Sequence, residues 1–153
     1  MEAGNVVLLP AILIFLSRGN LGWVSAVCMV PMGLMLIIGA YYWRAKLKRL
    51  ESRDYDFARA MGLIARLQWP VLGLTISACL LVAFAWARPG LFTSGWDQGA
   101  ATFSAIMALL EYVNYYHRQL QHFDHTEDFQ RLLRGNGLRP SQMAKDLKLY
   151  HGQ

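Results

Sequence analysis

The residues best suited to chemistry lie in one polar stretch, residues 111–125, which continues directly from a long apolar run. Carboxylate, amide, phenol, imidazole and guanidinium groups all occur in it. On a helix, side chains that recur every three or four positions share one face. The spacing predicts one polar stripe, with His117 on its flank. The stripe consists of Glu111, Asn114, Arg118, Gln121 and His125.

A functional interpretation of this stripe is a polar pocket at the cytoplasmic end of a helical bundle. Glu111 would accept a proton or bind a cation there, because an acid in hydrocarbon is costly without a partner or water. Asn114 and Tyr115 would orient a headgroup or a substrate, and His117 with Arg118 would hold a phosphate. The predicted ligand-binding residues are Glu111, Asn114, Tyr115, His117, Arg118 and Gln121, with the ligand and any cofactor unspecified.

A structural interpretation of the same residues stays open beside the functional one. Glu111 would then pair with a neighbouring polar group such as Gln68 and hold two helices together. The residues after His117 would simply extend the helix into the cytoplasm. His122 and His125 have a spacing that metal ligands on a helix can use. The segment is expected to cross a helix boundary, where the two imidazoles need not converge, so we predict no metal site.

The elements that must position these side chains are long apolar runs. A helix of about 20 apolar residues matches the ~30 Å hydrocarbon core of a bilayer. Apolar residues make up 55% of the chain and charged residues 16%, against about 25% charged in ordinary soluble domains. We therefore predict an all-α fold, an integral membrane bundle of four transmembrane helices. The expected spans are residues 3–18, 21–43, 67–87 and 99–117.

The uncharged part of the first of these segments is short for a span, so a re-entrant or interfacial segment is the alternative for residues 3–18. Pro31 should kink the second span. Interfacial aromatic anchors are expected at its two ends: Trp23 at one, and Tyr41, Tyr42 and Trp43 at the other. Cys28 and Cys79 both fall inside spans and are expected to be free thiols that pack as small apolar groups.

Helical extensions on the cytoplasmic side should connect and follow the spans. Residues 44–66 are expected to form a helical hairpin, interrupted at residues 54–56, and residues 1–123 to form the bundle. A cytoplasmic tail, residues 124–153, should hold two short amphipathic helices. A capping box predicts the first from Asp124 to Arg134, and Pro140 suits the first turn of the second. The pair should lie against the bilayer or a partner.

Basic residues set the expected orientation. Lys and Arg gather in residues 44–66 and in the tail, so both regions should be cytoplasmic by the positive-inside rule, and so should both termini. The net charge of +5 is placed beside apolar runs, where it suits anionic lipid rather than nucleic acid. We expect an integral protein of a bacterial inner membrane, with the lipid bilayer as its surroundings.

Two classes of function follow from these patterns. The first is a small multi-pass membrane protein that acts as a structural or accessory subunit, through self-association or within a larger membrane complex. The alternative is a membrane-embedded enzyme, or a lipid- or ion-handling protein, with its polar site around Glu111 to Arg118. Ser104 lies at mid-depth without a plausible base beside it, so nucleophilic catalysis has little support.

Overall fold

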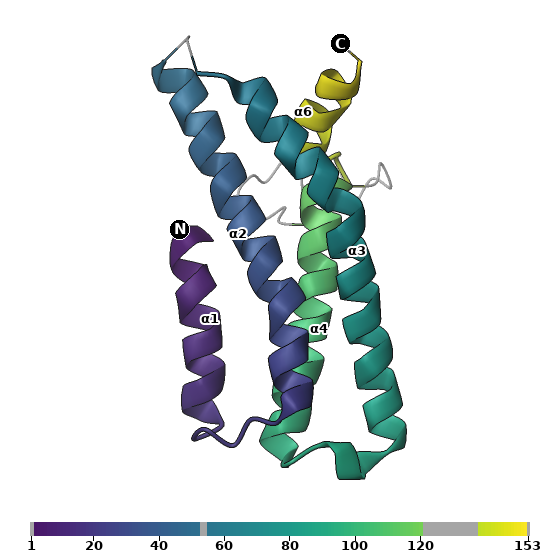
Figure 1. Cartoon of the computed structure of the whole chain (residues 1–153). Coiled ribbons are helices and arrows are strands. Elements are labelled where there is room, and N and C mark those ends of the chain that lie inside the picture. The colour runs from purple at the N-terminus through teal and green to yellow at the C-terminus, as the bar shows by residue number, and fades with distance from the viewer. Residues whose placement is uncertain (1, 53–54, 121–137, 153) are drawn as a thin grey trace.

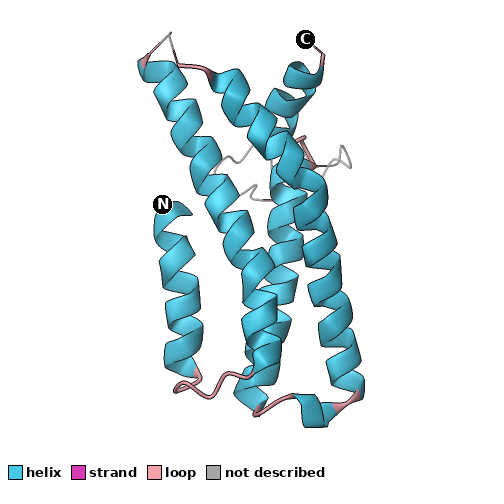
Figure 2. Ribbon diagram, viewed as in Figure 1, coloured by secondary structure: helices cyan, strands magenta, loops and turns pink. Residues whose placement is uncertain are grey.

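The computed structural model describes residues 2–52, 55–120 and 138–152, and the regular elements in these ranges are all helical (Figure 2). The prediction of an all-α fold is confirmed for this part of the chain. Two of the helices, α2 and α3, are long and apolar enough to cross a membrane, and α1 is a shorter apolar helix. The elements are α1 (Glu2–Leu16), α2 (Trp23–Glu51), α3 (Phe57–Ala87), η1 (Pro89–Leu91), α4 (Gly95–Tyr116) and α6 (Gln142–His151).

The helices stand side by side and alternate in direction (Figure 1). The α1–α2 and α3–α4 connections lie together at one end, called here the lower end after its place in the figure. The α2–α3 turn and α6 lie at the opposite, upper end. α4 packs against both α2 and α3, whereas α1 packs chiefly on α2. Consecutive helices are therefore antiparallel neighbours, as short connections favour.

Local signals fix most helix ends where the sequence predicts them. The carboxylate Oδ1 of Asp56 accepts a hydrogen bond of 3.0 Å from the backbone N–H of Arg59 and so caps α3. α3 ends at Ala87, directly before Arg88-Pro89-Gly90, where proline and glycine stop a helix. α2 continues to Glu51 and α3 begins at Phe57, so helix is present on both sides of the predicted interruption. Arg18 and Gly19 take φ values of 50° and 76° in the tight turn before α2.

α4 packs closely on α2 and α3, and its inner face carries small side chains. Ala101, Ser104, Ala105 and Ala108 are all buried. Rows of small residues spaced by four let helix backbones approach closely. Thiols add contacts between neighbours: the Cys28 Sγ lies 3.9 Å from the Ala78 carbonyl oxygen, across the α2–α3 interface. Both cysteines are free.

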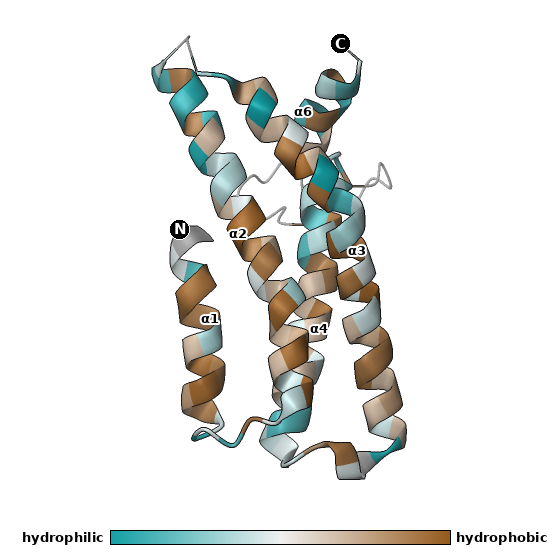
Figure 3. Ribbon diagram, in the orientation of Figure 1, coloured by the Kyte–Doolittle hydropathy of each residue, from teal (hydrophilic) through white to brown (hydrophobic). Residues whose placement is uncertain are grey.

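Large apolar side chains also stand exposed on the outer faces of the same helices, and Figure 3 shows the hydrophobic colour along their middle sections. Polar colour gathers toward the upper end of α2 and α3 and in α6. This outward apolar surface is the reverse of a water-soluble bundle, which turns its polar face to solvent. Examples on three helices are Ile37, Leu80 and Ile106.

The tail differs from its prediction in one respect. The last helix forms, as α6, but Pro140 lies before its N-cap rather than in its first turn, because Ser141 caps it by accepting a 3.0 Å hydrogen bond from the Ala144 N–H. α6 packs on α3 and α4 of its own chain, with Met143 and Leu147 buried. The helix predicted from Asp124 to Arg134 lies outside the described residues.

Candidate functional site

The predicted polar stripe is only partly helical. α4 ends at Tyr116 and His117 is its C-cap, so Arg118 lies beyond the helix and off the predicted face. The prediction that the helix continues past His117 is therefore wrong. The backbone after Tyr116 instead pairs with the tail, through the Gln119 N–H to the Arg139 carbonyl and the Ser141 N–H to the His117 carbonyl. Gln121 and His125 lie outside the described residues.

Glu111 lies inside α4 as expected, one turn before the helix end. Its side chain is half-buried, and its Oε2 is shielded from solvent. Gln68, named in the structural interpretation as a partner, lies beside the hydroxyl of Tyr112, the next residue along α4. Polar groups of α3 and α4 therefore do meet at this level, and the role of Glu111 itself remains a prediction.

Asn114 and Tyr115 come together in a cavity of about 240 Å³ at the upper end. Its walls come from α2, from the end of α4 and from the start of α6. The lining residues are Tyr42, Trp43, Asn114, Tyr115, Gln119, Ser141, Gln142 and Met143. The Asn114 amide oxygen also accepts a 2.9 Å hydrogen bond from the Leu120 N–H, which closes the chain over the helix end. The spacing of Met143 in the predicted last helix is a periodic signal, but nothing in it indicates that this helix returns to Asn114 and Tyr115.

His117 and Arg118 join the tail to the bundle. The His117 carbonyl accepts a 3.2 Å hydrogen bond from the Ser141 N–H, and Arg118 forms an isolated antiparallel bridge with Pro140. The Arg118 guanidinium donates to the Leu138 carbonyl at 2.6 Å. Ser141 donates its hydroxyl to the Tyr115 carbonyl. Both side chains that were expected to hold a phosphate are exposed and adjoin a structural junction.

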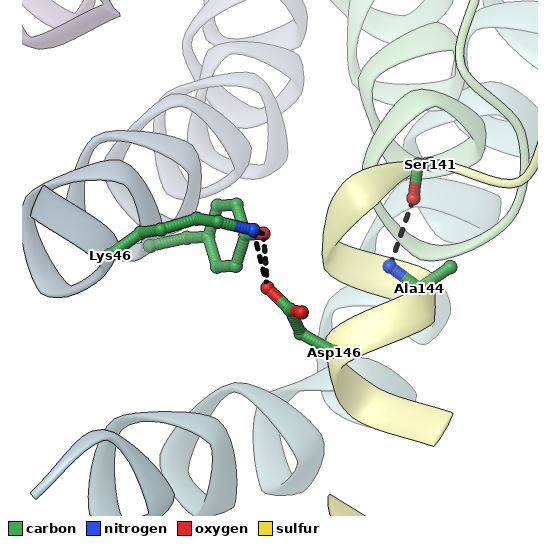
Figure 4. Close-up of polar contacts among 5 residues, drawn as sticks. Lys46, Ser141, Ala144 and Asp146 are labelled. Atoms are coloured by element: carbon green, nitrogen blue, oxygen red, sulfur yellow. Dashed lines mark hydrogen bonds and ion pairs between the residues drawn. The ribbon is translucent and has the colours of Figure 1, made fainter. Parts of the chain in front are cut away.

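An ionic contact fastens α6 to α2 (Figure 4). The Lys46 ammonium lies 2.8 Å from the Asp146 carboxylate, and both side chains are largely shielded from solvent. The Tyr42 hydroxyl donates a 2.6 Å hydrogen bond to the same carboxylate oxygen and accepts one of 3.1 Å from Lys46. Charge-assisted bonds of this kind are stronger than neutral ones, so the contact orients α6.

A second polar cluster, at the lower end, was missed by the sequence analysis. Asp97, in the first turn of α4, is fully buried. Its carboxylate accepts hydrogen bonds from the Gly22 N–H at 2.8 Å and from the Thr93 N–H at 2.9 Å. The Thr93 and Ser25 hydroxyls also donate to it, and Ser25 donates to the Asp97 carbonyl as well. We call Gly22, Ser25, Thr93, Ser94 and Asp97 the Asp97 cluster.

The cluster holds its carboxylate ionised. Burial raises the pKa of Asp97, but the hydrogen bonds from Ser25, Thr93 and Gly22 outweigh it, and the pKa lies below its usual range. The spacing of Ser94 and Asp97, three apart before an apolar run, was the available sequence signal, since Ser94 accepts a 3.1 Å bond from the Asp97 N–H. Nothing in the spacing indicates the partners near residue 22.

In the described ranges no three His, Cys, Asp or Glu side chains come together as metal ligands. The pair His122 and His125 lies outside those ranges. Comparisons with protein-family models, with curated proteins and with solved structures find no match for this chain. Its function has to be argued from its own residues.

Proposed function

We propose that this protein is a four-span integral membrane protein that acts as an accessory subunit, by associating with an apolar helix of a partner or of a second copy. The proposed membrane lies between the upper and lower ends of the bundle. The upper end, with α6 and the α2–α3 turn, faces the cytoplasm of a bacterial inner membrane, and so do both termini.

Exposed aromatic residues support this placement. Trp23 and Tyr41 on α2 are separated by 18 residues, about 27 Å of helix, and Trp69 and Trp86 on α3 by 17 residues, about 26 Å. Both separations approach the ~30 Å hydrocarbon thickness, and aromatic belts mark the two interfaces of a bilayer. α1, with 15 residues, is about 22 Å long and crosses only if the bilayer thins or its ends snorkel.

A single observation carries the proposal of association. An open apolar cavity of about 300 Å³ lies between α1 and α4 near the lower end. We call it the α1–α4 groove. Small residues, Gly99 and Ala100, form part of its lining between the bulkier Trp96 and Phe103, and α1 contributes leucines and an isoleucine. Small residues flanked by bulky ones suit the packing of a second helix into the groove, because helices in lipid associate through close backbone contact at small residues.

Blocking the groove tests the proposal. Gly99 has open space where a side chain would begin, so Gly99→Leu fills the groove without a clash in the chain itself. Gly33→Leu on α2 is the matched control, because Gly33 also has open space. Mild-detergent extraction from native membranes, followed by cross-linking and mass spectrometry of proteins and lipids, should recover a partner or a dimer with wild type and Gly33→Leu. Gly99→Leu should lose it.

Recovery of a lone monomer with lipid from all three proteins would overturn the association proposal. A second candidate, a lipid- or ion-handling site, is favoured by the cavity at Asn114 and Tyr115. Asn114→Ala would then release a bound lipid or ion while the bundle stays folded and any partner is retained. Loss of a partner in Gly99→Leu supports the accessory subunit, whereas loss of a bound lipid or ion in Asn114→Ala supports the lipid- or ion-handling protein.

A further inference from the structure

Another cavity, of about 990 Å³, is lined by residues of α2, α3 and α6 and by Tyr55 and Asp56 just before α3. We call it the arginine cavity. Its polar lining consists of Tyr41, Tyr55, Asp56, Arg59, Arg66 and Tyr150. An adjoining cavity of about 370 Å³ shares Tyr55 and Tyr150 and adds Arg49.

We propose that the arginine cavity binds a phosphate-bearing anionic group, such as the headgroup of an acidic phospholipid. Arg59 and Arg66 are seven apart on α3, so they share a face of the helix about 10 Å apart along its axis. Long arginine side chains can converge on one group from that distance. Leu63 lies between them and also lines the cavity, giving it an apolar contact for the start of an acyl chain.

The positive charges of Arg59 and Arg66 are available to bind an anion. Neither takes part in an ion pair with another described residue. Asp56 lines the same cavity and caps α3 by accepting from the Arg59 backbone N–H, so its single negative charge leaves the two arginines in excess by one positive charge. Guanidinium groups present several donors in a plane and bind phosphate oxygens in pairs. Three tyrosine hydroxyls add neutral donors around the same space.

Gly62 on α3 allows the side chain of Tyr150 on α6 to line the arginine cavity. A Cβ there would lie 2.9 Å from the Tyr150 hydroxyl oxygen, so only the bare backbone lets the hydroxyl of α6 approach α3 this closely. The cavity is thus formed jointly by the tail and the bundle. The docking of α6 through Lys46 and Asp146 therefore also completes the proposed site.

The depth of the cavity suits a lipid headgroup, on the membrane placement proposed above. Tyr41 lies at the end of the apolar part of α2, and Arg66 directly precedes the apolar part of α3. Arg59 and Tyr55 lie farther out. A phosphate held between the two arginines would sit just beyond the hydrocarbon, where phospholipid phosphates lie. Free phosphate compounds share this chemistry, so the test must separate the two sources.

Native mass spectrometry of the full chain in detergent provides the test. Phosphatidylglycerol, phosphatidylcholine and inorganic pyrophosphate are titrated separately. The variant R59Q/R66Q removes both charges. The control R44Q/K145Q removes two exposed charges that line neither cavity. Phosphatidylglycerol affinity should fall about 30-fold in R59Q/R66Q, at roughly fivefold for each basic residue near an anionic surface, and less than about threefold in the control.

Pyrophosphate binding with the same residue dependence, without preference for phosphatidylglycerol over phosphatidylcholine, would identify a soluble phosphate compound as the ligand. Tyr150→Phe removes one hydroxyl and should weaken binding about 2- to 10-fold. Equal affinities of R59Q/R66Q and R44Q/K145Q for both anionic probes overturn the proposal. If the double variant does not fold, unchanged binding in R59Q, R66Q and Tyr150→Phe overturns it. Pyrophosphate binding does not require a membrane, so the result is independent of the proposed orientation and partner.

Discussion

Removal of the Asp97 carboxylate should destabilise the bundle more than removal of any exposed acid. In Asp97→Ala, the backbone N–H groups of half-buried Gly22 and exposed Thr93 lose their acceptor, and water can replace part of what is lost. A fully buried donor without a partner costs about 1–3 kcal/mol, so two part-buried donors at the lower end of that range predict a loss of about 2 kcal/mol in free energy of unfolding. Ser25 keeps the Asp97 carbonyl oxygen as an acceptor, so its hydroxyl adds little to the loss.

Asp97→Asn should have a smaller effect. An amide has one oxygen, so it can accept from only one of the two backbone donors, which lie on different carboxylate oxygens. One part-buried donor without an acceptor predicts a loss of about 1 kcal/mol. The expected order of stability is wild type, then Asp97→Asn, then Asp97→Ala.

Unfolding of purified protein in mixed micelles, by titration with SDS and detection of helix loss by circular dichroism, measures these differences. Asp56→Ala is the matched control, because Asp56 also lies at the start of a helix but is exposed, and loss of such a cap typically costs about 1 kcal/mol. An Asp97→Ala protein as stable as Asp56→Ala would refute the reasoning, since the Gly22 and Thr93 N–H groups would then have found other partners.

The pH dependence gives an independent check. The pKa of Asp97 is lowered by folding, so its carboxylate stabilises the folded state at pH values above the unfolded pKa of about 3.9. That stabilisation is lost as the pH falls through the lower folded pKa. The difference in SDS midpoint between wild type and Asp97→Asn should be constant from neutral pH to about pH 5 and shrink below about pH 4. A difference that persists at lower pH would contradict an ionised carboxylate.

Other predictions concern orientation, the tail and the packing of α4. Exposed Gly90→Cys should react with an impermeant thiol reagent in intact cells and Lys145→Cys should not; the reverse labelling would invert the proposed topology. Asp146→Asn should weaken the docking of α6 and increase proteolysis of the tail, with the bundle intact, because it removes the ionic contact to Lys46; unchanged cleavage would contradict this. Ala105→Leu should cost about 1–3 kcal/mol in the same SDS assay through overpacking, whereas exposed Leu109→Ala should cost less. Equal losses would show that α4 does not need a small inner face.

The fold was largely predictable because its strongest signals are local. Apolar run length, the Pro-Gly stop after Arg88 and the Asp56 cap each act within a few residues. They predicted an all-α chain and the extents of α2 and α3. The small residues of α4 were a readable signal too, since Ala101 and Ala105 have the four-residue spacing of close helix contacts, and the sequence analysis did not use it.

The candidate site was less predictable because it depends on contacts between distant segments. Asn114 and Tyr115 lie in a cavity that needs Ser141 to close it, and the cavity exists only because the tail turns back on α4. Helical periodicity also assumed that α4 continues past Tyr116. The chain instead exchanges helical bonds for pairing with residues 138–141, a choice set by tertiary packing rather than by local propensity.

The Asp97 cluster has a consequence for how the protein is made. Its donors are the backbone of Gly22, the N-cap of α2, and the hydroxyl of Ser25 in the first turn of α2, and their acceptor follows 75 residues after Gly22, at the start of α4. In the proposed membrane topology, a nascent chain that has inserted only its first three helices keeps these donors without their acceptor and lacks α4. The insertion of α4 and the formation of this cluster are then a single step of folding.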